Sequence, residues 1–210
     1  MFRFLRNPSL VVTALILTAL MLVACSGPTT TDPSGDATGP QEIVGATELL
    51  PFDAATFPAG NDPAVAGACA ASAVVPGAYR CELAAGGADE PCFALGGARL
   101  VCGPNPVAGS ARTLVSPSAP LPSLQPPPPD QRVEFFVELR DGPTCAIRTG
   151  PEPVIVGGAA ATFDCDAPYT YLTTIDKSGP TWRATLVTLD PATGAAATTT
   201  AGEVARAWVP

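Results

Sequence analysis

Six cysteines between residues 69 and 165 carry the clearest chemical signal in the chain. An even number of cysteines is typical of a disulfide framework in an exported protein. Zinc binding is the competing interpretation, but zinc sites favour closely spaced C-x-x-C pairs and commonly include histidine. The nearest of the six cysteines are ten residues apart, and the chain has no histidine. We therefore predict three disulfides and no metal site.

The pairing of these cysteines is not fixed by sequence, because six cysteines allow fifteen connectivities. The two C-terminal cysteines lie in what read as neighbouring strands, far along the chain from the other four. Locality within the chain therefore favours Cys69–Cys81, Cys92–Cys102 and Cys145–Cys165. Each such loop is expected to contribute about 2 to 4 kcal/mol, mainly by restricting the unfolded chain.

The absence of histidine limits the catalytic chemistry that the chain can perform. Ser-His-Asp and Cys-His mechanisms both need an imidazole base. Carboxylates are the remaining acid/base groups, and Asp89 with Glu90, or Glu134 with Glu138, could in principle hydrolyse a glycoside. We interpret these four carboxylates as solvated surface groups and assign no catalytic residue.

Two other sets of side chains could bind a ligand. Asp164, Asp166 and Asp176 could contribute oxygen ligands to calcium, but no calcium-loop motif surrounds them, so no cofactor is predicted. The larger aromatic residues could stack on a ligand, although at strand positions they are more often part of a core. These aromatic residues are Tyr79, Tyr169, Tyr171, Trp182 and Trp208.

A seventh cysteine, Cys25, ends a segment of a different kind. Arg3 and Arg6 precede an apolar run over residues 10–23, and the small residue Ala24 comes directly before the cysteine. This arrangement indicates an export signal over residues 1–24. The apolar run of about 14 residues is shorter than the roughly 20 that span a bilayer. A permanent helical anchor is therefore not expected.

The tetrapeptide Leu22-Val23-Ala24-Cys25 resembles the lipobox of bacterial lipoproteins that signal peptidase II cleaves. The resemblance implies that the Cys25 thiol carries a diacylglycerol thioether, and that cleavage leaves this cysteine as an acylated N-terminus bearing chains such as palmitate. Ser26 would then be compatible with the outer membrane in a cell that has one. The alternative is an ordinary signal peptide followed by an incidental cysteine. Each buried acyl CH₂ contributes about 0.8 kcal/mol to membrane binding.

Residues 25–46 are predicted to be the lipidated cysteine and a flexible tether. Residues 26–40 contain no aromatic or large aliphatic side chain, so they cannot bury enough apolar surface to offset the entropy of ordering. From Cys25 onward the chain has nine basic and 19 acidic residues, a net charge near −10. This charge disfavours nucleic acid and anionic headgroups as partners.

The spacing around three cysteines provides a second resemblance. Ala78-Tyr79-Arg80-Cys81, Pro91-Cys92-Phe93 and Leu100-Val101-Cys102 are similar to a pattern in uncharacterised secreted proteins of GC-rich bacteria. The resemblance implies secretion and brings no activity with it.

The patterning elsewhere predicts a mainly β fold, a small disulfide-bonded sandwich or barrel. Residues 133–140 alternate as a half-buried strand does, with Phe136 as the single apolar residue on the polar face. Residues 62–72 are the one helix candidate, with Pro63 at the first helical position. A proline-rich connector over residues 116–130 would join a cysteine-rich lobe, residues 47–115, to a sheet lobe, residues 131–210.

These features predict a lipid-anchored extracytoplasmic protein whose biochemical activity the sequence does not define. We favour a non-enzymatic binding module of the cell envelope, held at the membrane by the lipid on Cys25, whose partner is an envelope protein or glycan. The alternatives are a carboxylate-dependent hydrolase acting on an envelope polymer, and a secreted inhibitor that exposes a rigid disulfide-bound loop.

Overall fold

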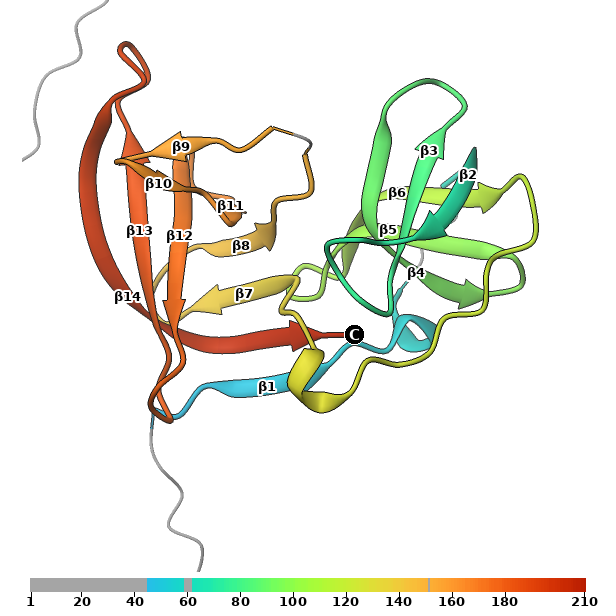
Figure 1. Ribbon diagram of the computed structural model, residues 1–210, viewed down its shortest axis with the longest axis horizontal. Helices are drawn as coiled ribbons and strands as arrows, with labels where there is room; N and C mark the ends of the chain where they lie inside the picture. Colours follow the sequence, from blue (N-terminus) through green and yellow to red (C-terminus); the bar gives the residue numbers. More distant parts are fainter. Residues whose placement is uncertain (1–44, 59–61, 151) are drawn as a thin grey trace, which may run out of the picture. The chain divides into compact units, whose positions relative to one another are not determined.

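The last strand, β14 (Ala196–Val209), organises the C-terminal half of the fold. Its first half pairs antiparallel with β13 (Arg183–Leu189), and its second half pairs antiparallel with β7 (Phe136–Leu139). The same second half also pairs in parallel with β1 (Glu48–Pro51). Figure 1 shows this long curved strand running from the β13 hairpin to the C-terminus, with β1 and β7 beside it.

The computed structural model describes residues 45–58, 62–150 and 152–210. These residues belong to one compact unit, Glu42–Pro210. The predicted signal peptide, Cys25 and nearly all of the predicted tether lie outside the described residues. Within the described residues, no helix is long and apolar enough to cross a membrane.

The C-terminal sheet has seven strands in the order β1-β14-β13-β12-β11-β8-β7, and the pairing of β14 with β7 closes it. Its other strands are β8 (Thr144–Ile147), β11 (Phe163–Cys165) and β12 (Thr170–Asp176). The interior is filled by Val137, Leu172, Leu186 and their buried neighbours. A small hairpin of β9 (Ile155–Val156) and β10 (Ala159–Ala160) packs against the sheet through Val156 and Val187.

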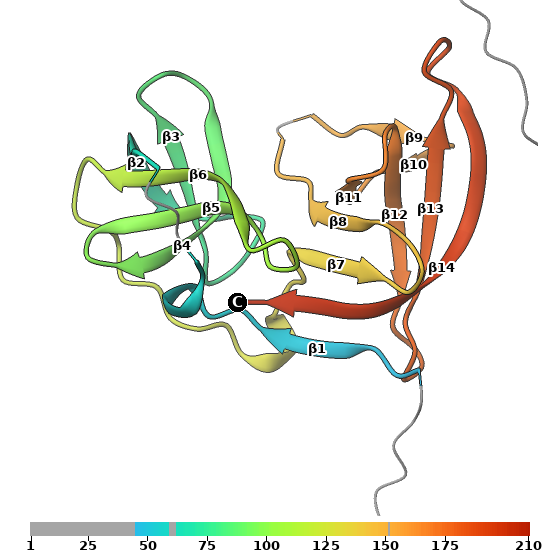
Figure 2. The same ribbon diagram turned by 180° about the vertical axis from the view of Figure 1, so that it is seen from behind.

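The N-terminal sheet is a closed five-stranded barrel. Its strands run antiparallel from β2 to β6, and β2 closes the barrel by pairing in parallel with β6. Single-turn 3₁₀ helices, η1 (Ala54–Thr56) and η2 (Pro129–Gln131), flank it in the chain. The strands are β2 (Val65–Ala71), β3 (Tyr79–Leu83), β4 (Ala88–Gly96), β5 (Arg99–Asn105) and β6 (Ser110–Pro117). Figure 2 shows this barrel from behind.

The mainly β, disulfide-bonded barrel fold is therefore confirmed, but the helix expected at residues 62–72 is wrong. This segment contains β2, which has partners on both sides, β3 and β6. Alanine-rich composition is only a weak preference for helix, and tertiary pairing overrides it.

All three disulfides join residues that lie directly opposite each other on neighbouring antiparallel strands. Cys69 pairs with Cys81 across β2 and β3, and Cys92 pairs with Cys102 across β4 and β5. The third disulfide, Cys145–Cys165, crosses β8 and β11. These are the pairs that locality in the sequence favours. Each bond therefore fixes the register of one strand pair.

The strand β1 falls within residues 47–115, the range expected for the first lobe, yet it pairs with β14 in the C-terminal sheet. In this pairing Glu48–Pro51 lies opposite Arg206–Val209. The two segments are about 155 residues apart in the chain. No local pattern in the sequence signals a parallel pairing over such a distance.

An aromatic cluster links the barrel to the C-terminal sheet. Phe93 on β4, Phe52 after β1 and Phe135 before β7 contact one another, with ring centroids 4.8 to 5.2 Å apart. Phe136 and Trp208 extend the same buried cluster. Phe136, which looks misplaced on the polar face of its strand, is therefore buried against Trp208.

Replacing Cys145 and Cys165 together with alanine should lower the free energy of unfolding by about 3 kcal/mol, because the bond closes a long loop in the unfolded chain. Urea unfolding of the full chain under non-reducing conditions measures this loss. The matched control is the exposed substitution Ala85→Ser, which should change the value by less than about 0.5 kcal/mol. A double variant as stable as the control would contradict a stabilising role for the bond.

Candidate functional site

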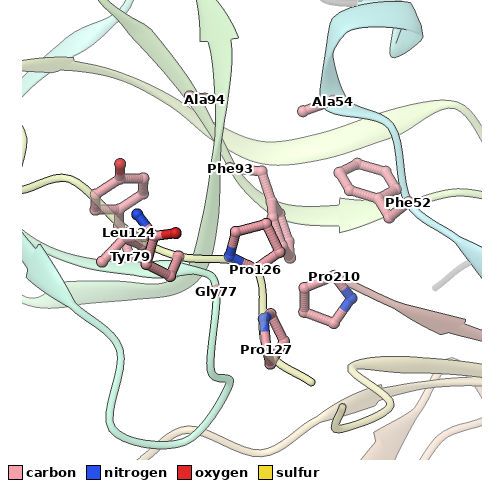
Figure 3. A pocket seen from close by; sticks show the side chains of 11 residues that line it. Phe52, Ala54, Gly77, Tyr79, Phe93, Ala94, Leu124, Pro126, Pro127 and Pro210 are labelled. Atoms are coloured by element: carbon pink, nitrogen blue, oxygen red, sulfur yellow. The ribbon is translucent and has the colours of Figure 1, made fainter. Parts of the chain in front are cut away.

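A pocket of about 270 Å³ lies where the barrel meets the proline-rich segment and the C-terminal residue. Figure 3 shows the side chains of Tyr79, Phe93, Phe52 and Pro126 around it. Small residues complete the wall at Ala54, Gly77 and Ala94. The remaining lining residues are Leu124, Gln125, Pro127 and Pro210.

Three separate segments supply the aromatic wall. Tyr79 begins β3, Phe93 lies on the neighbouring strand β4, and Phe52 follows β1. The Cys92–Cys102 disulfide fixes the register of the residue next to Phe93. The rings of Phe52 and Phe93 also belong to the aromatic cluster that links the two sheets, so the wall is held in place by buried packing.

The proline-rich segment forms the opposite wall. It runs between β6 and β7 and packs along the barrel. The Tyr79 hydroxyl donates a hydrogen bond to the Pro122 carbonyl oxygen at 3.1 Å. Pro127 is buried, and a Cβ at Gly77 would lie 2.9 Å from its Cδ. Gly77 has φ of +89°, so both its backbone conformation and this contact require glycine.

The lining of this pocket is mostly apolar. Tyr79 has the only titratable side chain among its lining residues, and its hydroxyl already bonds to the chain. Gln125 is exposed and offers the one side-chain amide. Apolar walls with few polar groups suit an apolar ligand group. The lining side chains supply no nucleophile or general base for a reaction at this place.

The expectation that Asp89 and Glu90 are solvated is wrong. Both lie on β4 and are only 6% and 3% exposed, respectively. Asp89 Oδ1 lies 3.3 Å from Arg112, while its Oδ2 has no hydrogen-bond partner. Glu90 accepts a hydrogen bond from the Ser72 hydroxyl and lies 3.7 Å from Arg80. An unpaired buried charge is costly, and the nearby cations offset this cost for the two carboxylates.

The second proposed acid/base pair, Glu134 and Glu138, also has cationic partners. Glu134 is 8% exposed, which again contradicts a solvated position, and lies 2.5 Å from Lys177 Nζ. Glu138 lies 2.5 Å from Arg206, and this hydrogen bond raises the pKa of Arg206. Glu134 and Lys177 line a second cavity of about 280 Å³, and Glu138 is not among its lining residues.

The three aspartates considered for calcium have different partners from one another. Asp164 pairs with Arg148, and Asp166 accepts hydrogen bonds from the Thr144 amide and hydroxyl. Asp176 accepts from the Ser178 amide, which lowers the pKa of this aspartate. The one described set of cysteine and acidic groups close enough to share an ion is Cys81, Cys92 and Cys102. Those sulfurs are all in disulfides.

The aromatic candidates occupy different environments. Trp208 is in the buried cluster, as expected for core, and Trp182 packs partly buried against the core of the C-terminal sheet. Tyr171 packs beside the β9–β10 hairpin. Tyr169 is 55% exposed, so its assignment to the core is wrong. Tyr79 alone among them lines the pocket described above.

Sequence reasoning missed most of the pocket. Phe52, Leu124 and Pro126 carry no motif, and their proximity to Phe93 depends on how the proline-rich segment crosses the barrel. The available signals are Tyr79, which is among the aromatic residues considered for ligand stacking, and Phe93, which directly follows Cys92 in the cysteine pattern. No protein-family model, curated protein or solved structure matches the chain.

The Glu134–Lys177 ion pair leads to an asymmetric prediction. Its carboxylate side chain is 10% exposed and its ammonium side chain 44% exposed. Lys177→Met leaves a buried charge without its partner and should cost about 1 to 3 kcal/mol of unfolding free energy. Glu134→Gln leaves a solvated ammonium and should cost less than about 1 kcal/mol.

Urea unfolding at pH 7 measures both losses. Arg99→Met, which removes an exposed cation on β5, is the control for loss of charge alone. Equal losses for the two variants of the pair would contradict the difference in burial as the cause.

Proposed function

We propose that this chain is a lipid-anchored extracytoplasmic protein of the cell envelope that binds a protein partner and catalyses no reaction. The observation that carries the proposal is the apolar pocket formed by Phe52, Tyr79, Phe93 and the proline-rich segment. The anchor is the lipid proposed on Cys25, and no nucleic acid is expected to bind.

The three disulfides support an extracytoplasmic location. Disulfides persist in oxidising compartments and are rare in the reducing cytosol. The chain also has the export signal described for residues 1–24, followed directly by Cys25. Together these features support release from the cytosol and attachment to the outer side of a membrane, the outer membrane where the cell has one.

The composition of the pocket supports a protein partner over a glycan. Sugars are recognised through several polar groups placed around their hydroxyls, whereas apolar side chains anchor protein partners in small desolvated pockets. This pocket has apolar rings on two sides. The Tyr79 hydroxyl already bonds to the chain, so Gln125 is the one polar side chain of the lining that is left to bond to a ligand. Its volume of about 270 Å³ suits one or two apolar side chains of a partner protein.

The carboxylates support binding over hydrolysis. A glycosidase needs two carboxylates on either side of one bond. Here Glu90, Glu134 and Glu138 each face a cation, and none of them lines the aromatic pocket. Asp89, the fourth carboxylate considered for hydrolysis, also lies beside a cation, Arg112. This pairing of all four disfavours the hydrolase alternative.

Ala94→Asp tests the pocket, because Ala94 is exposed on its wall. The new charge would be desolvated by an apolar partner, so the dissociation constant should rise at least tenfold. Partners are captured from solubilised envelopes with the full chain, and the purified candidate is then measured by isothermal titration calorimetry.

The matched control is Ala85→Asp, which places the same charge on the exposed β3–β4 turn. This variant should bind as the unaltered chain does. A partner that binds both variants equally does not use this pocket, and the proposal then fails.

The anchor predicts a specific covalent product. Intact mass spectrometry of the chain isolated from membranes should give an N-terminal diacylglyceryl cysteine at position 25, and Cys25→Ser should move the chain to the soluble fraction. A chain that stays in the membrane fraction after this substitution would contradict the lipid as the anchor.

A further inference from the structure

Part of β14 has a free edge in the closed C-terminal sheet. Its residues Ala196–Gly202 run beside β13 along one side, and all of them except Ala197 have a partner in the register. Along the other side pairing begins only after this stretch, where the Arg140 amide donates to the Glu203 carbonyl at 2.7 Å and β7 then pairs from Val204. Within the described residues, seven consecutive residues therefore have β13 as their one strand partner. Figure 1 shows this part of β14 on the outside of the sheet.

This edge lacks two of the features that usually keep sheet edges from pairing. Natural edges are commonly protected by charged side chains, prolines or bulges. Residues 196–202 contain no charged residue and no proline. The one irregularity in the β13–β14 pairing is on β14 itself, where Ala197 is left out between the pairs Thr188–Thr198 and Leu189–Ala196, at the turn end of the edge. Residues 196–201 are all exposed. The edge is therefore open to another extended strand.

The turn before the edge holds the hairpin in shape. The Asp190 side chain accepts hydrogen bonds from the amides of Ala192 and Thr193 at 2.7 and 3.0 Å. These bonds favour the ionised carboxylate and lower the pKa of Asp190. The edge is thus presented by an ordered hairpin.

The sequence of the edge is symmetric about its centre. Reading outward from Thr199, threonine occurs at 198 and 200, alanine at 197 and 201, and the small residues alanine and glycine at 196 and 202. Two antiparallel copies of this edge would place Thr199 opposite Thr199 and Thr198 opposite Thr200. Threonine favours strands, and cross-strand threonine pairs are stabilising.

We propose that this edge pairs with the same edge of a second copy of this chain, across a two-fold axis at Thr199. The paired length would be about 24 Å, from seven residues at about 3.4 Å each. The structure favours a second copy because the edge is matched to itself in sequence and has no charge that would select a different partner.

Charge elsewhere on the chain makes this pairing dependent on salt. From Cys25 onward each copy has a net charge near −10, which opposes approach at long range. No charge lies on the edge itself. The charges that repel one another are therefore exposed to solvent, and salt screens their repulsion. Added salt should therefore strengthen the association of the two copies, whereas added salt would weaken an interface held together by ion pairs.

The test uses two variants with opposite charges at the axis, Thr199→Lys and Thr199→Glu. Thr199 is exposed, so neither variant should change the thermal midpoint by more than about 2 °C. Sedimentation of the full chain in a mild detergent should give two copies per particle for the unaltered chain at about 10 µM. Each variant alone should give one copy, because like charges face each other at the axis.

An equimolar mixture of the Lys and Glu variants should recover the two-copy particle, since unlike charges then meet at the axis. The control Ala192→Lys adds a charge in the exposed turn beside the edge and should leave the two-copy particle intact. An unaltered chain that stays a single copy up to about 100 µM in 0.5 M salt, or a mixture that stays a single copy while the unaltered chain pairs, would overturn the proposal. Failure of this test leaves the pocket and its partner unaffected, because Ala94 lies on β4 in the other sheet.

Discussion

The contact among Phe52, Phe93 and Phe135 is the interaction on which the described structure depends. Each ring comes from a different segment, and the three centroids lie within 5.2 Å of one another. Aromatic rings bury large areas and add about 0.5 to 1.5 kcal/mol per well-oriented pair. This cluster links the barrel to the C-terminal sheet, and two of its rings, Phe52 and Phe93, also belong to the aromatic wall of the pocket. The pocket therefore depends on the packing of the two sheets.

The disulfides fix the register of the strands that hold these parts in place. Each one joins directly opposed residues of two neighbouring strands, and four of the six sulfurs lie in the barrel. The barrel core beside them is small, with Leu100 and Val115 as its largest fully buried residues. A small core gives little stability alone, and fixed register in the strands that carry Tyr79 and Phe93 therefore keeps the aromatic wall in place.

The sequence predicted what depends on local pattern and missed what depends on distant contacts. Strand alternation around Phe136 and the spacing of the cysteines are local. The alternation predicted a strand where β7 lies, although Glu134 and Phe136 on its expected polar face are buried, and the spacing led to the observed bonds. The parallel pairing of β1 with β14 joins segments far apart in the chain, and the burial of Asp89 depends on packing within the barrel, where Arg112 lies beside it. No local periodicity encodes either feature. The helix prediction for residues 62–72 was wrong for the same reason, because strand partners on both sides outweigh the helix preference of alanine. The pocket was missed because a proline-rich sequence indicates an extended chain but not the surface on which it packs.

The most direct test of the aromatic link is whether the two sheets unfold together. Hydrogen exchange measured by mass spectrometry across a urea series reports peptides from β3–β6 and from β12–β14 separately in the full chain. If Phe52, Phe93 and Phe135 couple the sheets, both sets of peptides should open at the same urea midpoint, and Phe135→Ala should separate the two midpoints. Two well-separated midpoints in the unaltered chain would contradict the coupling, and with it the claim that the pocket is a fixed feature of the fold.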